Sequence, residues 1–571
     1  MTAPRAIRAL ALGMVALVLA ACSGLPTSGD AQPGKPLGAS PDDPDFLPLA
    51  SGPIKDGSPS DIVEGFIEAA ITPADNWATA KKFLTPEFAE SWRPAAGVLV
   101  DVSAQSRDVS STVDDDASSR DGDTAEVEVK IDQLASIDDS GAYSEARGTS
   151  TLAFVVVKTD GQWRISEAPD GVVIDESRFS RVYDDYPLQY FDQTWERLVP
   201  DVRWFPRRPA TIATTITQSL IGTGPSAWLE PAVQSAFPAD VRLARDAVPI
   251  DPDQVADVAL NRAALTVDER TLSRMRTQLQ ATLEASGVHV SQVRFTVDGR
   301  TLEAGIVKLV EEPQDAGSIV LKDGAFGTLV GREITPIPAV TDDILGLPQP
   351  VVSIDVAADD SAAAVKLADG AVYLAGDGRV DRLDDRPGLV KPSLDPYGYV
   401  WSVPAHAPSA LLAIGPDVVS HGVGGAWPNA VEVSSIRVSA DGARIAAVVE
   451  MGAERWVVVS AVIRDADGTP TQLGPLKQVT QLDGPASGLV WLGSDRLGIL
   501  TELDGAVVRT QIVGGTGDDG SAPAGSVAIA GSRSEMGAKV LAADGALFSR
   551  SGAAWRQAAT GVQVLATRAG H

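Results

Sequence analysis

The last part of the chain repeats one phrase, and a repeat constrains a fold more than any other sequence feature. Ser353–Asp360 reads SIDVAADD and Ser435–Gly442 reads SIRVSADG, while Ser393–Gly398 (SLDPYG) lies between them. The three copies are about 40 residues apart, and weaker copies occur at Leu489–Leu500 and Ser526–Leu547. A strand, an acidic or glycine turn and a second strand at a period of about 40–45 residues are typical of β-propeller blades.

We therefore expect residues 340–571 to form an all-β propeller. A β-sandwich also consists of short strands, but its strands would not repeat one strand–turn–strand phrase. The copies leave the number of blades open between five and six.

The first residues have the three-part layout of an export signal. Arg5 and Arg8 are basic, Ala9–Leu19 is apolar, and Leu19-Ala20-Ala21 leads into Cys22. The apolar run is shorter than the roughly 20 residues that cross a bilayer. Because a thiol that follows small residues can be alkylated by a diacylglyceryl donor, we interpret residues 1–21 as a signal peptide. Leu19–Cys22 resembles a bacterial lipobox.

Cys22 is the only cysteine in 571 residues, so a disulfide within the chain is excluded. We predict that it carries S-diacylglycerol and an N-palmitoyl chain, since two or three acyl chains anchor a protein far more stably than one. The expected location is the extracytoplasmic face of the cell membrane. The alternative is a buried thiol that happens to follow the signal peptide.

Composition argues against several classes of function. With 47 basic and 76 acidic residues the net charge is -29, which repels phosphate chains, so we expect no nucleic-acid partner.

Motifs for metal binding, nucleotide binding and catalysis are also missing from the sequence. The four histidines have no metal-ligand spacing, and we expect no metal. Gly515–Gly520 satisfies G-x-G-x-x-G, but it carries two aspartates and lacks a βαβ context, so we predict an acidic loop. With no nucleophile-elbow motif either, we expect neither an enzyme nor a cofactor.

Residues 22–57 are rich in Pro, Gly, Ser and Asp and predict a flexible tether. Ser58-Pro59-Ser60-Asp61 then predicts a helix start, and a second helix fits residues 76–84. Apolar residues then alternate with polar ones over residues 125–131, which predicts a strand, and a hairpin is predicted around Asp160-Gly161. Residues 58–178 are therefore predicted to be an α+β domain. Its order of elements and its ending at Val157–Ile165 resemble the NTF2-like cone. Some proteins with that fold are enzymes with an Asp/His pair inside the cone, but no histidine precedes His289 in this chain.

Residues 203–302 form a further predicted domain of the α/β class. Ile212, Ile216 and Leu220 line one helical face, while Leu272, Met275, Leu279 and Leu283 line another. A strand at Val293–Val297 leads into a turn at Asp298-Gly299. Together with Ser235–Pro238, these stretches resemble the GerMN domain. We interpret the leucine stripes as core.

The combination of these segments resembles the actinobacterial LpqB lipoproteins. The stretches that carry the resemblance are Leu19–Cys22, Arg197–Pro206, Ser235–Pro238 and Phe295–Gly299. The resemblance implies a non-enzymatic accessory protein of the MtrAB two-component system, which affects the cell envelope and division. Its implied partner is the extracytoplasmic domain of the sensor histidine kinase MtrB, and Cys22 is the one functional residue carried over.

Two other functions stay open at this stage. An envelope hydrolase would use the propeller channel, with Asp355, Asp395 and Arg437 as the side chains to examine. A lipoprotein that binds cell-wall glycan would need aromatic platforms, for which Trp401, Trp427 and Trp491 are candidates. Burial in the core is the more common fate of tryptophan.

Overall fold

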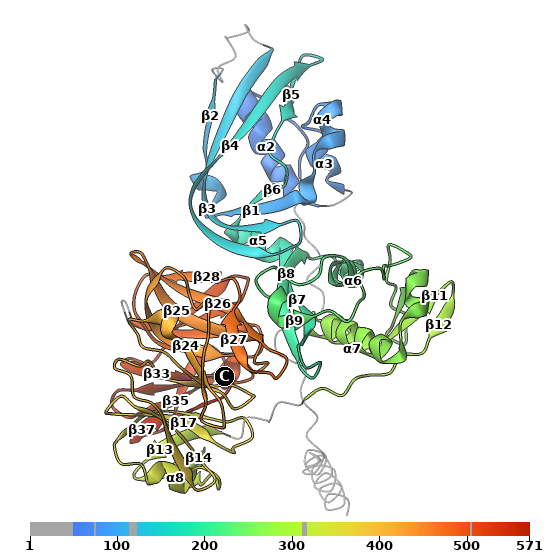
Figure 1. Cartoon of the computed structure of the whole chain (residues 1–571). Coiled ribbons are helices and arrows are strands. Elements are labelled where there is room, and N and C mark those ends of the chain that lie inside the picture. The colour runs from blue at the N-terminus through green and yellow to red at the C-terminus, as the bar shows by residue number, and fades with distance from the viewer. Residues whose placement is uncertain (1–49, 74–75, 113–122, 311–316, 503–504) are drawn as a thin grey trace, which may run out of the picture. The chain divides into compact units, whose positions relative to one another are not determined.

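The computed structural model describes residues 50–73, 76–112, 123–310, 317–502 and 505–571. The predicted signal peptide and most of the predicted tether lie outside these ranges. Along the chain, the described residues form an N-terminal α+β region, a middle region and a C-terminal ring of sheets (Figure 1).

Helix α2 (Pro59–Ala70) begins where the sequence predicts. The Ser58 hydroxyl accepts a hydrogen bond from the Asp61 backbone, and the Asp61 carboxylate accepts one from the Ser58 backbone, so a capping box fixes the helix start. The second predicted helix is shortened to α3 (Ala78–Lys81), because Asn76 and Trp77 have left-handed φ values of 54° and 57°. A separate helix, α4 (Pro86–Ser91), follows and is capped by Thr85.

The N-terminal sheet has the strand order β5-β4-β3-β1-β6, and β2 pairs with β3. The two long strands are curved and wrap around α2 (Figure 1). The predicted hairpin is confirmed, since Asp160 and Gly161 both have positive φ in the turn between β4 and β5. The interpretation as an NTF2-like cone stays a prediction. The strands are β1 (Gly97–Asp101), β2 (Asp108–Ser111), β3 (Thr124–Asp138), β4 (Tyr143–Thr159), β5 (Gln162–Glu167) and β6 (Val172–Asp175).

The middle region begins earlier than predicted. The expected boundaries at 178 and 203 fall inside α5 (Glu176–Val182) and β8 (Leu198–Pro206), and β8 pairs along its whole length with β7 (Tyr183–Asp192). Both strands are buried on both faces, so their sequences lack the alternation of apolar and polar residues from which a strand is predicted.

The predicted helices of the middle region are confirmed as α6 (Ile212–Gly222) and α7 (Glu269–Ala285). Their apolar stripes meet in one buried core, as expected. Strand β11 (Gln292–Val297) lies between the parallel β10 (Val255–Ala259) and the antiparallel β12 (Arg300–Leu302), while the short β9 (Val233–Gln234) pairs with β7.

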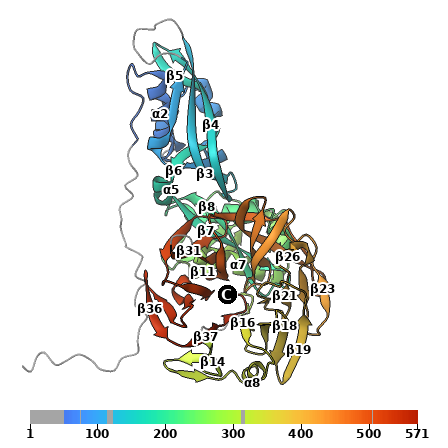
Figure 2. The same ribbon diagram turned by 90° about the vertical axis from the view of Figure 1, so that its left-hand side faces the viewer.

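Six sheets form the C-terminal ring in the part of the chain that is described, so the predicted propeller has six blades (Figure 2). The first strands of the blades contact one another around a closed circle, β37-β16-β20-β24-β29-β33. The strands of successive blades are β37 (Val562–Leu565) with β13 (Ser318–Lys322), β14 (Ala325–Val330) and β15 (Glu333–Thr335); β16 (Val351–Val356), β17 (Ala363–Leu367), β18 (Val372–Gly376), β19 (Arg379–Asp384) and β38 (Thr567–Arg568); β20 (Ser393–Leu394), β21 (Val400–Ser402), β22 (Leu412–Ile414) and β23 (Ser420–Gly422); β24 (Ala430–Val438), β25 (Arg444–Met451), β26 (Glu454–Arg464), β27 (Pro470–Leu473) and β28 (Lys477–Leu482); β29 (Ala486–Trp491), β30 (Arg496–Glu502), β31 (Ala506–Ile512) and β32 (Gly517–Ser521); β33 (Ser526–Ala530), β34 (Lys539–Ala542), β35 (Leu547–Ser551) and β36 (Ala554–Ala559).

The ring starts before the predicted residue 340. Strands β13–β15 form three quarters of a blade whose first strand, β37, comes from the C-terminal end of the chain. Val320 of β13 pairs with Leu565 of β37, and the short helix α8 (Thr341–Leu345) follows this blade. The first blade thus joins the two ends of the region and closes the circle.

The repeated phrase marks the first strands of the blades. Ser353 and Ser435 occupy the same position in β16 and β24, immediately after a β-bulge, and equivalent bulges precede Gly488 in β29 and Ala528 in β33. A bulge increases the local twist of a strand. One prediction is wrong here: the glycine-rich stretch expected as a loop contains β32, which pairs with β31 at the edge of its blade.

Candidate functional site

Asp355 and Arg437, which the sequence marks as possible catalytic residues, form a buried ion pair at the centre of the ring. The Arg437 Nη1 atom is 3.0 Å from Asp355 Oδ2. Asp355 also accepts hydrogen bonds from the Leu394 backbone N at 2.7 Å and from Thr567 Oγ1 at 2.6 Å. Both carboxylate oxygens are therefore engaged by the protein itself.

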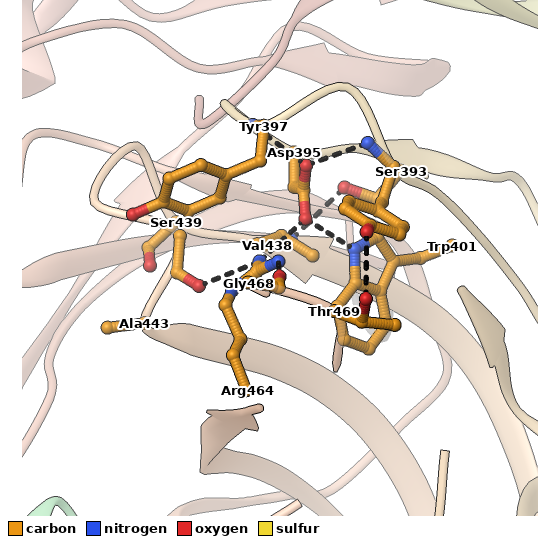
Figure 3. Close-up of polar contacts among 12 residues, drawn as sticks. Ser393, Asp395, Tyr397, Trp401, Val438, Ser439, Ala443, Arg464, Gly468 and Thr469 are labelled. Atoms are coloured by element: carbon orange, nitrogen blue, oxygen red, sulfur yellow. Dashed lines mark hydrogen bonds and ion pairs between the residues drawn. The ribbon is translucent and has the colours of Figure 1, made fainter. Parts of the chain in front are cut away.

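Asp395, the third candidate, lies in a separate polar network (Figure 3). Its Oδ2 atom accepts hydrogen bonds from Trp401 Nε1 at 3.0 Å and from Arg464 Nη2 at 2.7 Å. Its Oδ1 atom accepts the backbone N–H groups of Tyr397 and Tyr399, both at 2.9 Å. The network holds the turn between β20 and β21 against the end of β26.

Tyr397 extends from this turn and joins the ring to the middle region. Its hydroxyl donates a hydrogen bond to Asp192 Oδ2 at 2.9 Å. Two guanidinium groups contact its ring, with the Arg464 carbon 4.3 Å and the Arg197 carbon 5.0 Å from the ring centre. Burial and the Asp192 carboxylate raise the pKa of Tyr397, so the phenol stays protonated and acts as a donor.

Two cavities adjoin Tyr397. The larger has a volume of about 710 Å³ and is lined by residues of the β7–β8 turn, by β9 and by the propeller segment 464–468. The smaller, of about 460 Å³, is lined by Arg197, Arg568 and the turns that follow β16 and β20. We call these two cavities the Tyr397 crevice. Its size, and walls that combine apolar surface with charged and polar side chains, fit a binding role.

The sequence did not single out Arg464 or Asp192, although the structure places both at this crevice. Arg464 could have been noticed, because it is a lone charge at the end of the apolar run of β26. Asp192 gave no comparable signal. It accepts hydrogen bonds from the backbone N–H groups of Glu196 and Arg197, so in the sequence it looks like any other aspartate in a turn.

The remaining sequence candidates are placed as follows. Trp401, Trp427 and Trp491 are buried, with exposures of 0%, 1% and 0%, so they are core residues and not aromatic platforms. Cys22 lies outside the described residues. Within the described ranges there is no group of three or more His, Cys, Asp or Glu residues that could hold a metal ion. No helix in those ranges is long and apolar enough to cross a membrane.

Three family models match the chain in consecutive segments. Residues 52–180 match the N-terminal domain of lipoprotein LpqB, residues 187–303 match a domain of sporulation and spore germination proteins, and residues 324–566 match the LpqB β-propeller domain. The chain belongs to the LpqB lipoprotein family. The GerMN-like middle domain and the propeller predicted from the sequence are thereby confirmed.

Curated LpqB relatives extend over almost the whole chain. The LpqB lipoprotein of Streptomyces coelicolor is 28% identical and is covered to 90%, with 92% of this chain aligned. That of Nocardia farcinica is 26% identical, with 89% of this chain and 87% of the relative covered. Both names are those of lipoproteins and not of enzymes.

Two solved structures are also similar to parts of this LpqB chain. TolB from Acinetobacter baumannii is 13% identical with a TM-score of 0.33, covering 44% of this chain and 66% of TolB. The tandem GerMN domains of GerM from Bacillus subtilis are 14% identical with a TM-score of 0.18, covering 36% of this chain and 63% of GerM. The domain assignment rests on the strand pairing and the family models.

Proposed function

We propose that this LpqB lipoprotein is an extracytoplasmic accessory protein of a sensor histidine kinase of the MtrB type. In this proposal it is anchored in the membrane through Cys22 and changes the output of a two-component system that affects the cell envelope and division. It acts by binding, without catalysing a reaction. Membership in a lipoprotein family supports the anchor.

The observation that carries a binding role is the state of the polar side chains in the propeller. A general acid or base must exchange a proton with a substrate. Asp355 and Asp395 instead face Arg437 and Arg464 and are saturated by internal donors. Exposed acidic side chains of the propeller instead lie at the Tyr397 crevice, where the propeller meets the middle region.

The N-terminal domain fits the same kind of role. We propose that it is an NTF2-like cone whose interior is filled by its own helix. The cavity between α2 and the sheet, beside Phe66 and Phe154, has a volume of only about 20 Å³. This is close to the space of a single water molecule, so the domain would serve as a structural or protein-binding element.

Membrane anchoring would make a weak interface sufficient. A tether confines the folded part and the kinase to one surface, which raises their effective concentration. A binding partner shifts a kinase between two signalling states only if it binds one state more tightly than the other. A difference in binding free energy of about 1–3 kcal/mol changes the equilibrium between the two states about 5–150-fold.

The test is photo-crosslinking of the full chain in intact cells. A crosslinking residue replaces Asp467, an exposed turn residue at the rim of the Tyr397 crevice, and in the control it replaces Asp544, an exposed turn residue of another blade. We expect the kinase to be captured from position 467 and not from position 544, and to be lost in Cys22→Ala. Phosphorylation of the response regulator should change in cells that lack the protein.

Two outcomes would argue against this function. Absence of kinase from all adducts, together with unchanged phosphorylation, would contradict the proposal. Capture of cell-wall glycan instead would favour the glycan-binding alternative, although burial of the three tryptophans removes the observation that motivated it.

A further inference from the structure

Three cationic side chains gather around the segment Leu389–Pro392, which leads into β20. The ammonium group of Lys366, on β17, donates a hydrogen bond to the Leu389 carbonyl oxygen. Arg437, on β24, donates from Nη1 to the Pro392 carbonyl oxygen at 3.5 Å. Lys391 lies between these two carbonyl groups in the chain. The cations thus come from three successive blades and meet near the first strands of the ring.

Lys391 is the unusual member of this group. No hydrogen bond or ion pair holds its ammonium group among the residues that the structure describes. Burial lowers the pKa of Lys391, and the positive charges of Arg437 and Lys366 lower it further. A partly buried cation beside two others is unfavourable unless a negative charge accompanies it.

The carboxylate beside this group is already occupied. Asp355 is 3.0 Å from Arg437 and also accepts hydrogen bonds from the Leu394 backbone and Thr567. It balances one positive charge of the three. In the described ranges, neither Lys366 nor Lys391 forms an ion pair with a carboxylate.

Ser353 adds an uncharged donor to the same place. It pairs directly with Lys366 across β16 and β17, and residues opposite each other in an antiparallel pair project from the same face of the sheet. Its hydroxyl oxygen is buried and has no hydrogen-bond partner in the described part of the chain. A buried hydroxyl is normally paired.

We propose that Lys366, Lys391, Arg437 and Ser353 form a binding site for a small oxyanion, a phosphate or a carboxylate group, at the inner edges of the second, third and fourth blades. Lysine ammonium groups bind such anions as point charges through several N–H donors. The anion would supply the missing negative charge and the acceptor for the Ser353 hydroxyl, through charge-assisted hydrogen bonds. The site is independent of the kinase proposal.

The test is calorimetric titration of the purified full chain in detergent. Sodium phosphate and sodium acetate are added separately, with sodium chloride holding the ionic strength constant. We expect one of the two anions to bind, and Lys391→Gln to weaken its binding at least tenfold. Tighter binding of phosphate identifies a phosphoryl ligand, and tighter binding of acetate identifies a carboxylate. Lys82→Gln, an exposed lysine of the N-terminal domain, is the matched control and should bind as the wild type does.

Thermal melting without added anion gives a second readout. Lys391→Gln should melt at the same or a higher temperature than the wild type, because charge repulsion is removed. If that variant does not fold, Ser353→Ala takes its place and should bind the anion several-fold more weakly. The site is refuted if neither anion binds the wild type, or if the wild type and the folded variant bind it equally.

Discussion

Tyr397 donates a hydrogen bond to Asp192 at 2.9 Å, and this bond joins the first turn of the third propeller blade to the β7–β8 turn of the middle region. Asp192 is buried and also accepts the backbone N–H groups of Glu196 and Arg197. The same carboxylate therefore shapes a local turn and holds a neighbouring domain.

Tyr397→Phe removes this hydrogen bond and keeps the ring that contacts Arg197 and Arg464. We expect the free energy of unfolding to fall by about 1–3 kcal/mol, since a buried carboxylate loses one donor. Urea unfolding followed by tryptophan fluorescence measures the change. Tyr373→Phe is the control, because the Tyr373 hydroxyl has no hydrogen bond in the described ranges. Equal stability of both variants would show that the bond contributes nothing to stability.

Arg437→Met breaks the buried pair with Asp355 and should lower the free energy of unfolding by about 3–5 kcal/mol. The double variant with Asp355→Asn should recover part of this loss, because the carboxylate is no longer left without its cation. The exposed pair Arg262–Asp298 is the control, and Arg262→Met should cost less than about 1 kcal/mol. Additive effects at positions 355 and 437 would contradict the coupling.

The raised pKa of Asp185 predicts the sign of one contribution to the pH dependence of stability. Burial raises the pKa of its carboxyl, and Arg496, 3.7 Å away, offsets this only in part. In the window between about pH 3.9, the unfolded value, and the higher folded pKa, the folded state binds more protons, so stability falls as the pH rises. Asp185→Asn should therefore be more stable than the wild type at pH 7, with the difference vanishing below about pH 3.9. A less stable variant at pH 7 would mean that the ion pair with Arg496 outweighs burial.

Local patterns in the sequence predict much of this fold, because the causes are local. The Ser58 cap, the Asp160-Gly161 turn and the stripes of α6 and α7 each depend on a few neighbouring residues. The propeller phrase is also visible, since each blade repeats the bulged first strand. The left-handed backbone at Asn76 and Trp77, which shortens α3, gave no such pattern.

Features that depend on distant parts of the chain could not be predicted. The first blade is divided between β13–β15 and β37, so no single stretch of sequence contains the full repeat. The partners of Asp355 and Asp395 lie in other blades or strands, and only the fold shows that Arg437 and Arg464 neutralise them. The sequence marked three of these four side chains without revealing their pairing.

Closure of the ring leads to the last prediction. Truncation after Thr560 removes β37 and β38. The first blade then loses its first strand, β37, and the second blade loses β38, which pairs in parallel with β16. Val564 and Ala566 pack with Ile319 and Phe326 in the core between these blades, so the truncation exposes apolar surface on both sides. Because blades bury their faces against each other around a closed circle, we expect the loss to spread through the ring instead of staying local. The melting transition of the propeller should broaden and shift to lower temperature in calorimetry. Gln563→Ala, which changes an exposed side chain of β37 and keeps its backbone pairing, is the control and should melt as the wild type does. A truncated chain that melts cooperatively at the wild-type temperature would show that the six-bladed ring does not need its C-terminal strand.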